Sequence, residues 1–266
     1  MMRNETKVTT ASRNKAGNDT RKQVCSPDDI HVWLACFDFS KSKLTSFRKV
    51  LSKDEKTRAD RYLSEEARNC FIAARGTLRC ILSSYLSTDP ADIVFAYNSH
   101  GRPSVEFPPE TSGTVFNLSH SADKVLYAIS SGVPVGVDVE QMRSLDFAGI
   151  SKRFFAPAEA TAIASLHGPD QITAFFECWT RKEAFAKAQG TGLYLDLAQI
   201  EVSLGPGVPP RIVRIRGNEE DADNWSLHNI DAGEGFKAAL AVKSRHAQVI
   251  QRNYQTASGN DSVVDV

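Results

Sequence analysis

The segment 133–140, VPVGVDVE, constrains the fold more than any other stretch, because valine alternates with other residues throughout it. A period of two is typical of a β-strand, whose successive side chains point to opposite faces of a sheet. The valines therefore share one face, and Gly136, Asp138 and Glu140 share the other. Such a pair of carboxylates can hold Mg²⁺ together with water and phosphate oxygens, and Gly136 leaves room for a ligand to approach. An edge strand with a solvated acidic face is the alternative.

A helix predicted around 178–193, CWTRKEAFAKAQGTGL, supplies a third carboxylate. Trp179, Glu183 and Lys187 are spaced by four residues and line one helix face. Glu183 and Lys187 can touch, which is also typical of an ordinary exposed ion pair. The apolar flanks and the glycines Gly190 and Gly192 at the end favour a packed helix instead. We interpret the nearby aromatic residues as core: Phe154, Phe155, Phe175, Phe176 and Trp179.

Composition describes a globular chain of 266 residues, 41% of them hydrophobic and 24% charged. No apolar run is long enough to span a bilayer, so we expect no membrane partner. Lys and Arg number 32, as do Asp and Glu, so no overall field attracts nucleic acid, and we expect none as a partner. The 5 cysteines are odd in number and lack C-x-x-C spacing, which argues against a disulfide framework or structural zinc and favours a cytoplasmic location.

The order of predicted elements is helices followed by several strands, twice, which is typical of an α+β fold. Strands are expected at 31–37, 93–97, 114–118, 124–130, 133–140, 199–204, 211–217, 225–231 and 236–242. Helices are expected near 44–51, after a Ser64 cap up to Thr88, and at 158–166 and 171–189.

The two ends of the chain are polar and predict tails, a disordered one at 1–28 and a flexible one at 251–266. The first lacks the apolar stretch of a secretory signal. A mitochondrial presequence is the alternative, which Glu5 and Asp19 weaken.

GVDVE at 136–140, followed by WTRKEAFAKAQGTGL at 179–193, resembles the phosphopantetheinyl transferases of the surfactin-synthetase (Sfp) type. HGRP at 100–103, FNLSHS at 116–121 and KRFFAPAE at 152–159 resemble further motifs of that family in the same order. The resemblance covers about 51–193 strongly and the flanking strands weakly. It implies two similar α+β halves, 29–132 and 133–250, with the active site in the cleft between them.

The resemblance implies transfer of the 4′-phosphopantetheine arm of coenzyme A to a serine hydroxyl of an apo acyl or peptidyl carrier protein, releasing adenosine 3′,5′-bisphosphate. It further implies Mg²⁺ held by Asp138, Glu140 and Glu183. Glu183 is also the candidate general base, and Lys187 would neutralise the pyrophosphate or the leaving group. Asp138, Glu183 and Lys187 are therefore the catalytic candidates. Because one chain contains both halves, we expect a monomer.

By the same resemblance, coenzyme A also meets side chains outside the acidic group. His120 would lie near its 3′-phosphate with Arg58 as charge partner, and Ser119 would donate to the pyrophosphate. Arg102 stands where many relatives have lysine, and its planar fork can contact phosphate or adenine. The implied contacts with coenzyme A are Arg58, Arg102, Pro103, Ser119, His120, Lys182, Glu183 and Lys187. Lys182 lies off the face of Glu183, so a solvated lysine is its alternative; Lys56, Arg75 and Arg79 are further basic candidates with structural alternatives.

Two other classes of function fit parts of the sequence. A hydrolase could use Ser119, His120 and Asp138 as a triad, but neighbouring strand residues point to opposite faces and no G-x-S-x-G elbow is present. A non-catalytic module that binds coenzyme A or a carrier protein is the second, and the intact acidic residues argue against it.

Overall fold

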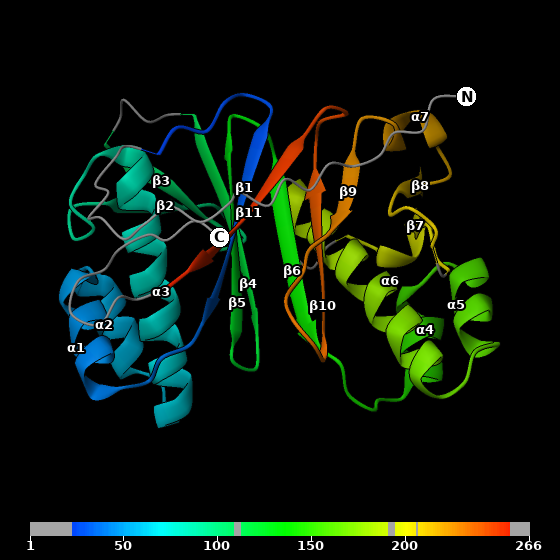
Figure 1. Cartoon of the computed structure of the whole chain (residues 1–266), viewed down its shortest axis with the longest axis horizontal. Helices are drawn as coiled ribbons and strands as arrows, with labels where there is room; N and C mark the ends of the chain where they lie inside the picture. The colour runs from blue at the N-terminus through cyan, green and yellow to red at the C-terminus, as the bar shows by residue number, and fades with distance from the viewer. Residues whose placement is uncertain (1–22, 109–112, 191–194, 206, 256–266) are drawn as a thin grey trace.

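The computed structural model describes residues 23–108, 113–190, 195–205 and 207–255, and it shows two β-sheets packed between two long helices. Helix α3 (Glu65–Leu86), a four-stranded sheet, a three-stranded sheet and helix α6 (Gly168–Gln189) follow one another as layers (Figure 1). The fold is α+β, as the sequence predicts. None of the described helices combines the length and apolar character needed to cross a membrane.

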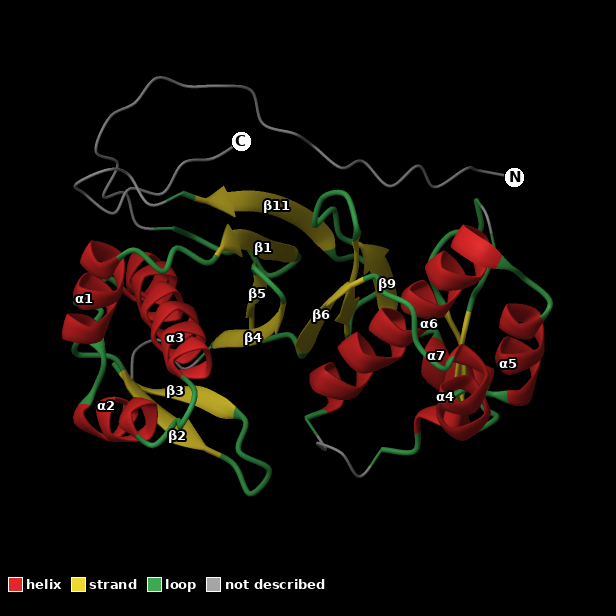
Figure 2. Ribbon diagram, turned by 90° about the horizontal axis from the view of Figure 1, so that it is seen from below, coloured by secondary structure: helices red, strands yellow, loops and turns green. Residues whose placement is uncertain are grey.

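The first sheet has the strand order β11-β1-β5-β4. Strands β1 (Asp29–Cys36), β5 (Lys124–Ser131) and β4 (Thr114–Ser121) are antiparallel neighbours, whereas β11 (Gln248–Tyr254) runs parallel to β1. Helix α3 covers the outer face, beginning at a Ser64 cap as predicted. Helices α1 (Lys41–Val50) and α2 (Lys53–Asp60) lie around α3, and the hairpin of β2 (Val94–Tyr97) and β3 (Pro103–Phe107) lies beside α3 and β4, as Figure 2 shows.

The second sheet has the order β6-β10-β9 and carries α6 on its outer face. Its strands are β6 (Val135–Gln141), β10 (Phe236–Val242) and β9 (Ser226–Asn229). Around α6 lie the smaller elements α4 (Phe147–Phe154), α5 (Pro157–Ala164), the short η3 turn (Leu197–Gln199), the pair β7 (Ile200–Val202) and β8 (Ile212–Ile215), and α7 (Glu219–Ala222).

The alternation in β6 places its two faces in different surroundings. Val135, Val137 and Val139 are fully buried between the sheets, as the pattern predicts. The opposite face packs against α6, so the alternative of a solvated acidic face is wrong. The expectation that Gly136 leaves room for a ligand is also wrong, because a Cβ there would lie 2.1 Å from the Ala184 carbonyl oxygen and 2.3 Å from the Ala188 nitrogen. Gly136 instead allows strand and helix backbones to pack closely.

The C-terminal boundary differs from the prediction. Residues 251–254, expected in a flexible tail, form the end of β11, and 248–250, expected in the second half, also pair with β1 of the first sheet. The polar run Gln251–Arg252–Asn253 gave no apolar alternation from which to predict this strand. An edge strand can expose polar side chains while its backbone forms hydrogen bonds with a neighbouring strand. Of the predicted N-terminal tail, residues 1–22 lie outside the described part, as do 256–266 at the other end.

Candidate functional site

The two sheets meet at β4 and β6 through side chains rather than through a shared backbone ladder. The Asn117 side-chain oxygen and the Ser119 and Ser121 hydroxyl oxygens accept hydrogen bonds from the backbone amides of Val137, Val139 and Gln141, at 2.9, 3.4 and 3.1 Å respectively. Both strands have a period of two, so every second side chain of β4 meets every second amide of β6. The candidate site is built on this joint.

Asp138 is the centre of the site and is only 3% exposed. Its Oδ1 accepts hydrogen bonds from the Ser119 hydroxyl at 2.8 Å and from Lys187 Nζ at 2.6 Å. Lys187 Nζ also donates to the Ser119 hydroxyl oxygen, at 2.7 Å. Burial raises the pKa of Asp138, while Lys187 and Ser119 act in the opposite direction. Strand β4 and helix α6 thus place one group each beside the Asp138 carboxylate of strand β6.

Glu140 and Glu183 complete an acidic group with Asp138. Glu140 Oε2 accepts a hydrogen bond from the Ser121 hydroxyl at 3.0 Å. Burial raises the pKa of Glu140, and the charge of Asp138 raises it further. The pKa of Glu183 is raised by burial first, and then by the charges of Asp138 and Glu140. The charges of these carboxylates act on one another's pKa values, so they lie in one region, while their role as Mg²⁺ ligands stays a prediction.

The acidic group offers oxygen donors of the kind that a hard divalent cation prefers. Asp138 Oδ2 is buried and accepts no hydrogen bond from any described residue, so one strong acceptor is left for a ligand. Oxygen ligands from carboxylates suit Mg²⁺. As the side chains stand, no three acidic, histidine or cysteine groups within the described ranges gather tightly enough to hold an ion. Lys187 supplies the positive charge beside Asp138 in this arrangement.

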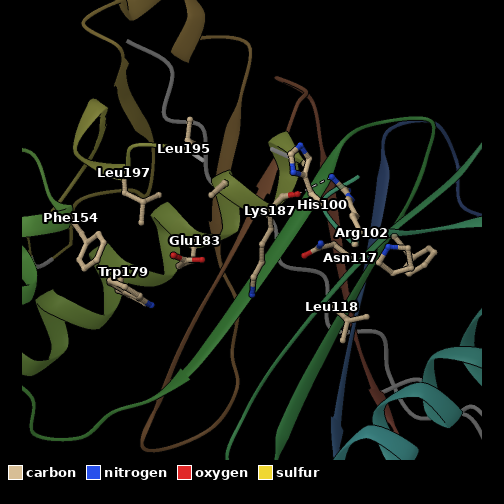
Figure 3. Close-up of a pocket in the computed structure, with 15 residues that line it drawn as sticks. His100, Arg102, Asn117, Leu118, Phe154, Trp179, Glu183, Lys187, Leu195 and Leu197 are labelled. Atoms are coloured by element: carbon tan, nitrogen blue, oxygen red, sulfur yellow. Dashed lines mark hydrogen bonds between the residues drawn. The ribbon is translucent and has the colours of Figure 1, made fainter. Parts of the chain in front are cut away.

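A cavity of about 490 Å³ opens beside the acidic group. Figure 3 shows Glu183, Trp179 and Phe154 on one side of it and Arg102, Asn117 and Leu118 on the other. Leu195 and Leu197 extend the apolar wall, and Lys187 lines the same cavity. The cavity therefore joins an apolar surface to a charged end.

A second cavity, of about 480 Å³, lies beyond Leu118, which lines both. Arg58, Arg75 and His120 line this second cavity together with Glu66, and Arg75 Nε also lies 3.4 Å from the Glu55 carboxylate; we call this cavity the cationic pocket. The Arg58 guanidinium lies over the Phe71 ring at 5.2 Å, and that of Arg75 over the Phe95 ring at 5.0 Å. His120 is exposed at its edge, yet partial loss of hydration, and then the charge of Lys187, lower its pKa. The predicted neighbours Arg58 and His120 thus share one pocket.

Lys182 is not placed for a ligand, so both interpretations offered by the sequence are wrong. Its side chain is fully buried, and Nζ lies 2.6 Å from the Glu159 carboxylate. It also donates to the Leu197 carbonyl at 2.9 Å and to the Ile200 carbonyl. One residue along a helix is a turn of about 100°, which takes Lys182 away from the cavity and toward α5. Its donors are engaged inside the protein.

Arg102 lines the first cavity, but its guanidinium is already bound to the protein. Nη1 donates to the carbonyls of Lys187 and Ala188, at 2.9 and 3.3 Å, and Nη2 to the carbonyl of Val135 at 3.2 Å. The expectation of a phosphate or adenine contact therefore conflicts with the structure. Pro103 lines the same cavity, as expected of a residue near the ligand.

Arg79, Lys56 and the hydrolase triad are the remaining candidates from the sequence. Arg79 is 1% exposed and binds Glu55 at 2.7 Å, so its structural alternative is correct. Lys56 reaches the Lys49 carbonyl at 3.4 Å and lines neither cavity. The hydrolase triad is not assembled, because the Ser119 hydroxyl donates to Asp138 while His120 lies in the second cavity, 6.0 Å from the Phe37 ring.

Sequence reasoning missed the apolar wall of the first cavity. Phe155, Phe175 and Phe176 are core, as interpreted, but Trp179 and Phe154 face the cavity. Trp179 stands four residues before Glu183, so its spacing already put it on the functional face. Leu195 and Leu197 had no such signal, because they follow the helix in a loop and a short turn.

The sequence is similar to known 4′-phosphopantetheinyl transferases over most of its length. Residues 134–241 match the family model "4'-phosphopantetheinyl transferase superfamily", and 36–132 match "4'-phosphopantetheinyl transferase, N-terminal". The 4′-phosphopantetheinyl transferase HetI of Nostoc sp. is 37% identical over 81% of this chain and 88% of its own. The 4′-phosphopantetheinyl transferase Sfp of Bacillus subtilis is 28% identical over 59% of this chain and 68% of its own.

Proposed function

Because the chain belongs to the 4′-phosphopantetheinyl transferase superfamily, we propose that it transfers the 4′-phosphopantetheine arm of coenzyme A to a serine of an apo acyl or peptidyl carrier protein. The serine oxygen attacks the phosphorus next to the pantetheine, the pyrophosphate P–O bond breaks, and adenosine 3′,5′-bisphosphate leaves. The observation that carries the proposal is the meeting of Asp138, Glu140, Glu183 and Lys187 at one cleft.

The two cavities suit the two ends of coenzyme A. The 3′-phosphate carries negative charge, and the cationic pocket offers it Arg58, Arg75 and His120. The pantetheine arm is less polar and fits the cavity walled by Phe154, Trp179 and Leu197. Leu118 lies where the cavities adjoin, so the pyrophosphate between the two ends would pass close to Lys187.

Asp138, Glu140 and Glu183 would hold Mg²⁺, which when bound neutralises the pyrophosphate charge. Lys187 adds a cation for the leaving group. Glu183 is our candidate for the acceptor of the serine proton, directly or through one water, because its carboxylate lines the cavity beside the acidic group. Ser119 holds Asp138 and Lys187 in place through its hydroxyl.

One chain supplies both walls of the cleft, with β4 on one side and β6 and α6 on the other, which supports a monomer of two halves. All 5 cysteines are free, which suits a reducing compartment such as the cytoplasm.

The test is the intact mass of an apo carrier protein after incubation with this protein, coenzyme A and Mg²⁺. We expect a gain of one phosphopantetheine, and no gain with a chelator. Glu183→Gln should abolish transfer while coenzyme A still binds. Glu177→Gln is the matched control on the same helix, because Glu177 pairs with Lys237 at 2.8 Å outside the cavities. Coenzyme A binding without transfer to any of several carriers would instead support a non-catalytic module.

A further inference from the structure

Arg102 is held at the end of a tightly built turn between β2 and β3. The Asn98 side-chain oxygen accepts hydrogen bonds from the backbone amides of His100 and Arg102, both at 2.9 Å. The Asn98 amide in turn donates to the Arg102 carbonyl at 3.1 Å, and Gly101 adopts a φ of 78° that favours glycine. The backbone from which the guanidinium projects is therefore fixed before any ligand binds.

The guanidinium connects this turn to helix α6 and to strand β6 of the three-stranded sheet. Lys187 and Ala188, whose carbonyls accept Nη1, lie in the last turn of α6, where helix carbonyls lack a full set of partners. Val135, whose carbonyl accepts Nη2, is the first residue of β6. Three residues after Val135 comes Asp138, and Lys187 is itself in the site. One side chain thus contacts both elements that carry the acidic group.

Gly190 makes this contact possible. It ends α6 in the left-handed conformation, with a φ of 71°. A Cβ at this position would lie 2.8 Å from Arg102 Nη1, closer than side-chain atoms normally approach. A cation at a helix C-terminus is also favoured by the helix dipole. The glycine and the arginine therefore fit each other at the end of the helix.

We infer that Arg102 is a positioning residue for the transfer reaction, which clamps the end of α6 to the start of β6 and so sets Lys187 and Glu183 over Asp138. This inference rests on the proposed function. It assigns Arg102 a role different from binding phosphate, because Nη1 and Nη2 are directed to backbone carbonyls. The role needs the planar fork, which reaches carbonyls on two elements; the compact ammonium of lysine keeps only the charge.

The deciding variant is Arg102→Lys, with Arg211→Lys as an exposed control outside both cavities. We expect Arg102→Lys to lower kcat between about tenfold and about a hundredfold, as small displacements of reacting groups do. The KM and the Kd for coenzyme A should change by less than a factor of about three, because a residue that positions the reacting groups affects kcat rather than substrate binding. Asn98→Ala, which loosens the turn, should show a weaker form of the same pattern.

Amide hydrogen exchange without ligand provides a readout independent of transfer. In Arg102→Lys we expect faster exchange at 187–190 and unchanged exchange in the middle of α6. A kcat within twofold of the wild type, or a loss confined to KM and Kd for coenzyme A, would overturn the inference. If the wild type modified no carrier, the proposed function would fail, and the clamp would then stand or fall on whether exchange at 187–190 changes.

Discussion

Replacing Lys182 by methionine separates the role seen in the structure from the ligand contact that family resemblance implies. In the structure, Lys182 is fully buried and its ammonium binds the Glu159 carboxylate and two carbonyls. Methionine has a similar length, so the substitution removes the charge and the donors without opening a large cavity. Glu159, itself 5% exposed, would remain as a buried carboxylate without its cation.

Breaking a buried ion pair by removing one partner costs about 3–5 kcal/mol, because the remaining charge is left without compensation. Part of the Glu159 charge stays satisfied, since its oxygens also accept the amides of Ala156 at 2.8 Å and Val202 at 2.7 Å. For a chain of this size, 1 kcal/mol moves Tm by about 2–4 °C, so we expect Lys182→Met to lower Tm by about 6–20 °C.

The assay is thermal denaturation followed by circular dichroism, with coenzyme A affinity measured by calorimetry well below the lowered Tm. Lys152→Met is the control, because Lys152 is exposed on α4 and exposed substitutions change stability by about 0.5 kcal/mol or less. We expect coenzyme A to bind folded Lys182→Met about as tightly as the wild type. A Tm within about 2 °C of the wild type together with tenfold weaker binding would refute the structural role and restore the ligand contact.

Three further substitutions test the site. Gly136→Ala should destabilise the protein by about 1–3 kcal/mol or more in urea unfolding, because its Cβ would meet the backbone of α6; unchanged stability would contradict that close packing. Coenzyme A affinity should rise as pH falls, because burial and then the charge of Lys187 lower the pKa of His120 in the free protein and a bound phosphate would raise it, so binding takes up a proton. Calorimetry across pH should show this slope in the wild type and lose it in His120→Asn. Lys187→Met should bind Mn²⁺ more tightly without coenzyme A, because a cation leaves Asp138, while transfer falls; spin-resonance titration giving equal affinities would contradict this.

The sequence predicts the acidic group well because both of its elements are regular. A period of two placed Asp138 and Glu140 on one face of a strand, and a spacing of four placed Glu183 and Lys187 on one face of a helix. The structure confirms that these faces meet, with Lys187 Nζ 2.6 Å from Asp138. Periodicity describes each face, however, and not the residues that pack on it.

The predictions for three residues, Gly136, Lys182 and Arg102, are wrong for that reason. The neighbours of Gly136 belong to α6, the partner of Lys182 is Glu159 on α5, and the carbonyls bound by Arg102 follow it by 33 to 86 positions. Family resemblance gave Lys182 and Arg102 as ligands because they are basic residues within matching motifs. A basic side chain can serve the protein interior equally well when carboxylates or carbonyls surround it.

The joint between the two sheets shares its serine hydroxyls with the acidic group, so neither of them can be altered without the other. The Ser119 hydroxyl accepts a hydrogen bond from the Val139 amide of β6 and donates one to Asp138. The Ser121 hydroxyl likewise accepts a hydrogen bond from the Gln141 amide and donates one to Glu140. Each hydroxyl therefore acts twice, once to attach β4 to β6 and once to orient a carboxylate. Since a strand alternates its side chains, the same period of two that aligns the carboxylates also aligns the serines opposite them. Any relative movement of the two sheets along β4 would consequently shift the hydrogen bonds of Asp138 and Glu140 together, so the geometry of the site depends directly on the packing of the two halves.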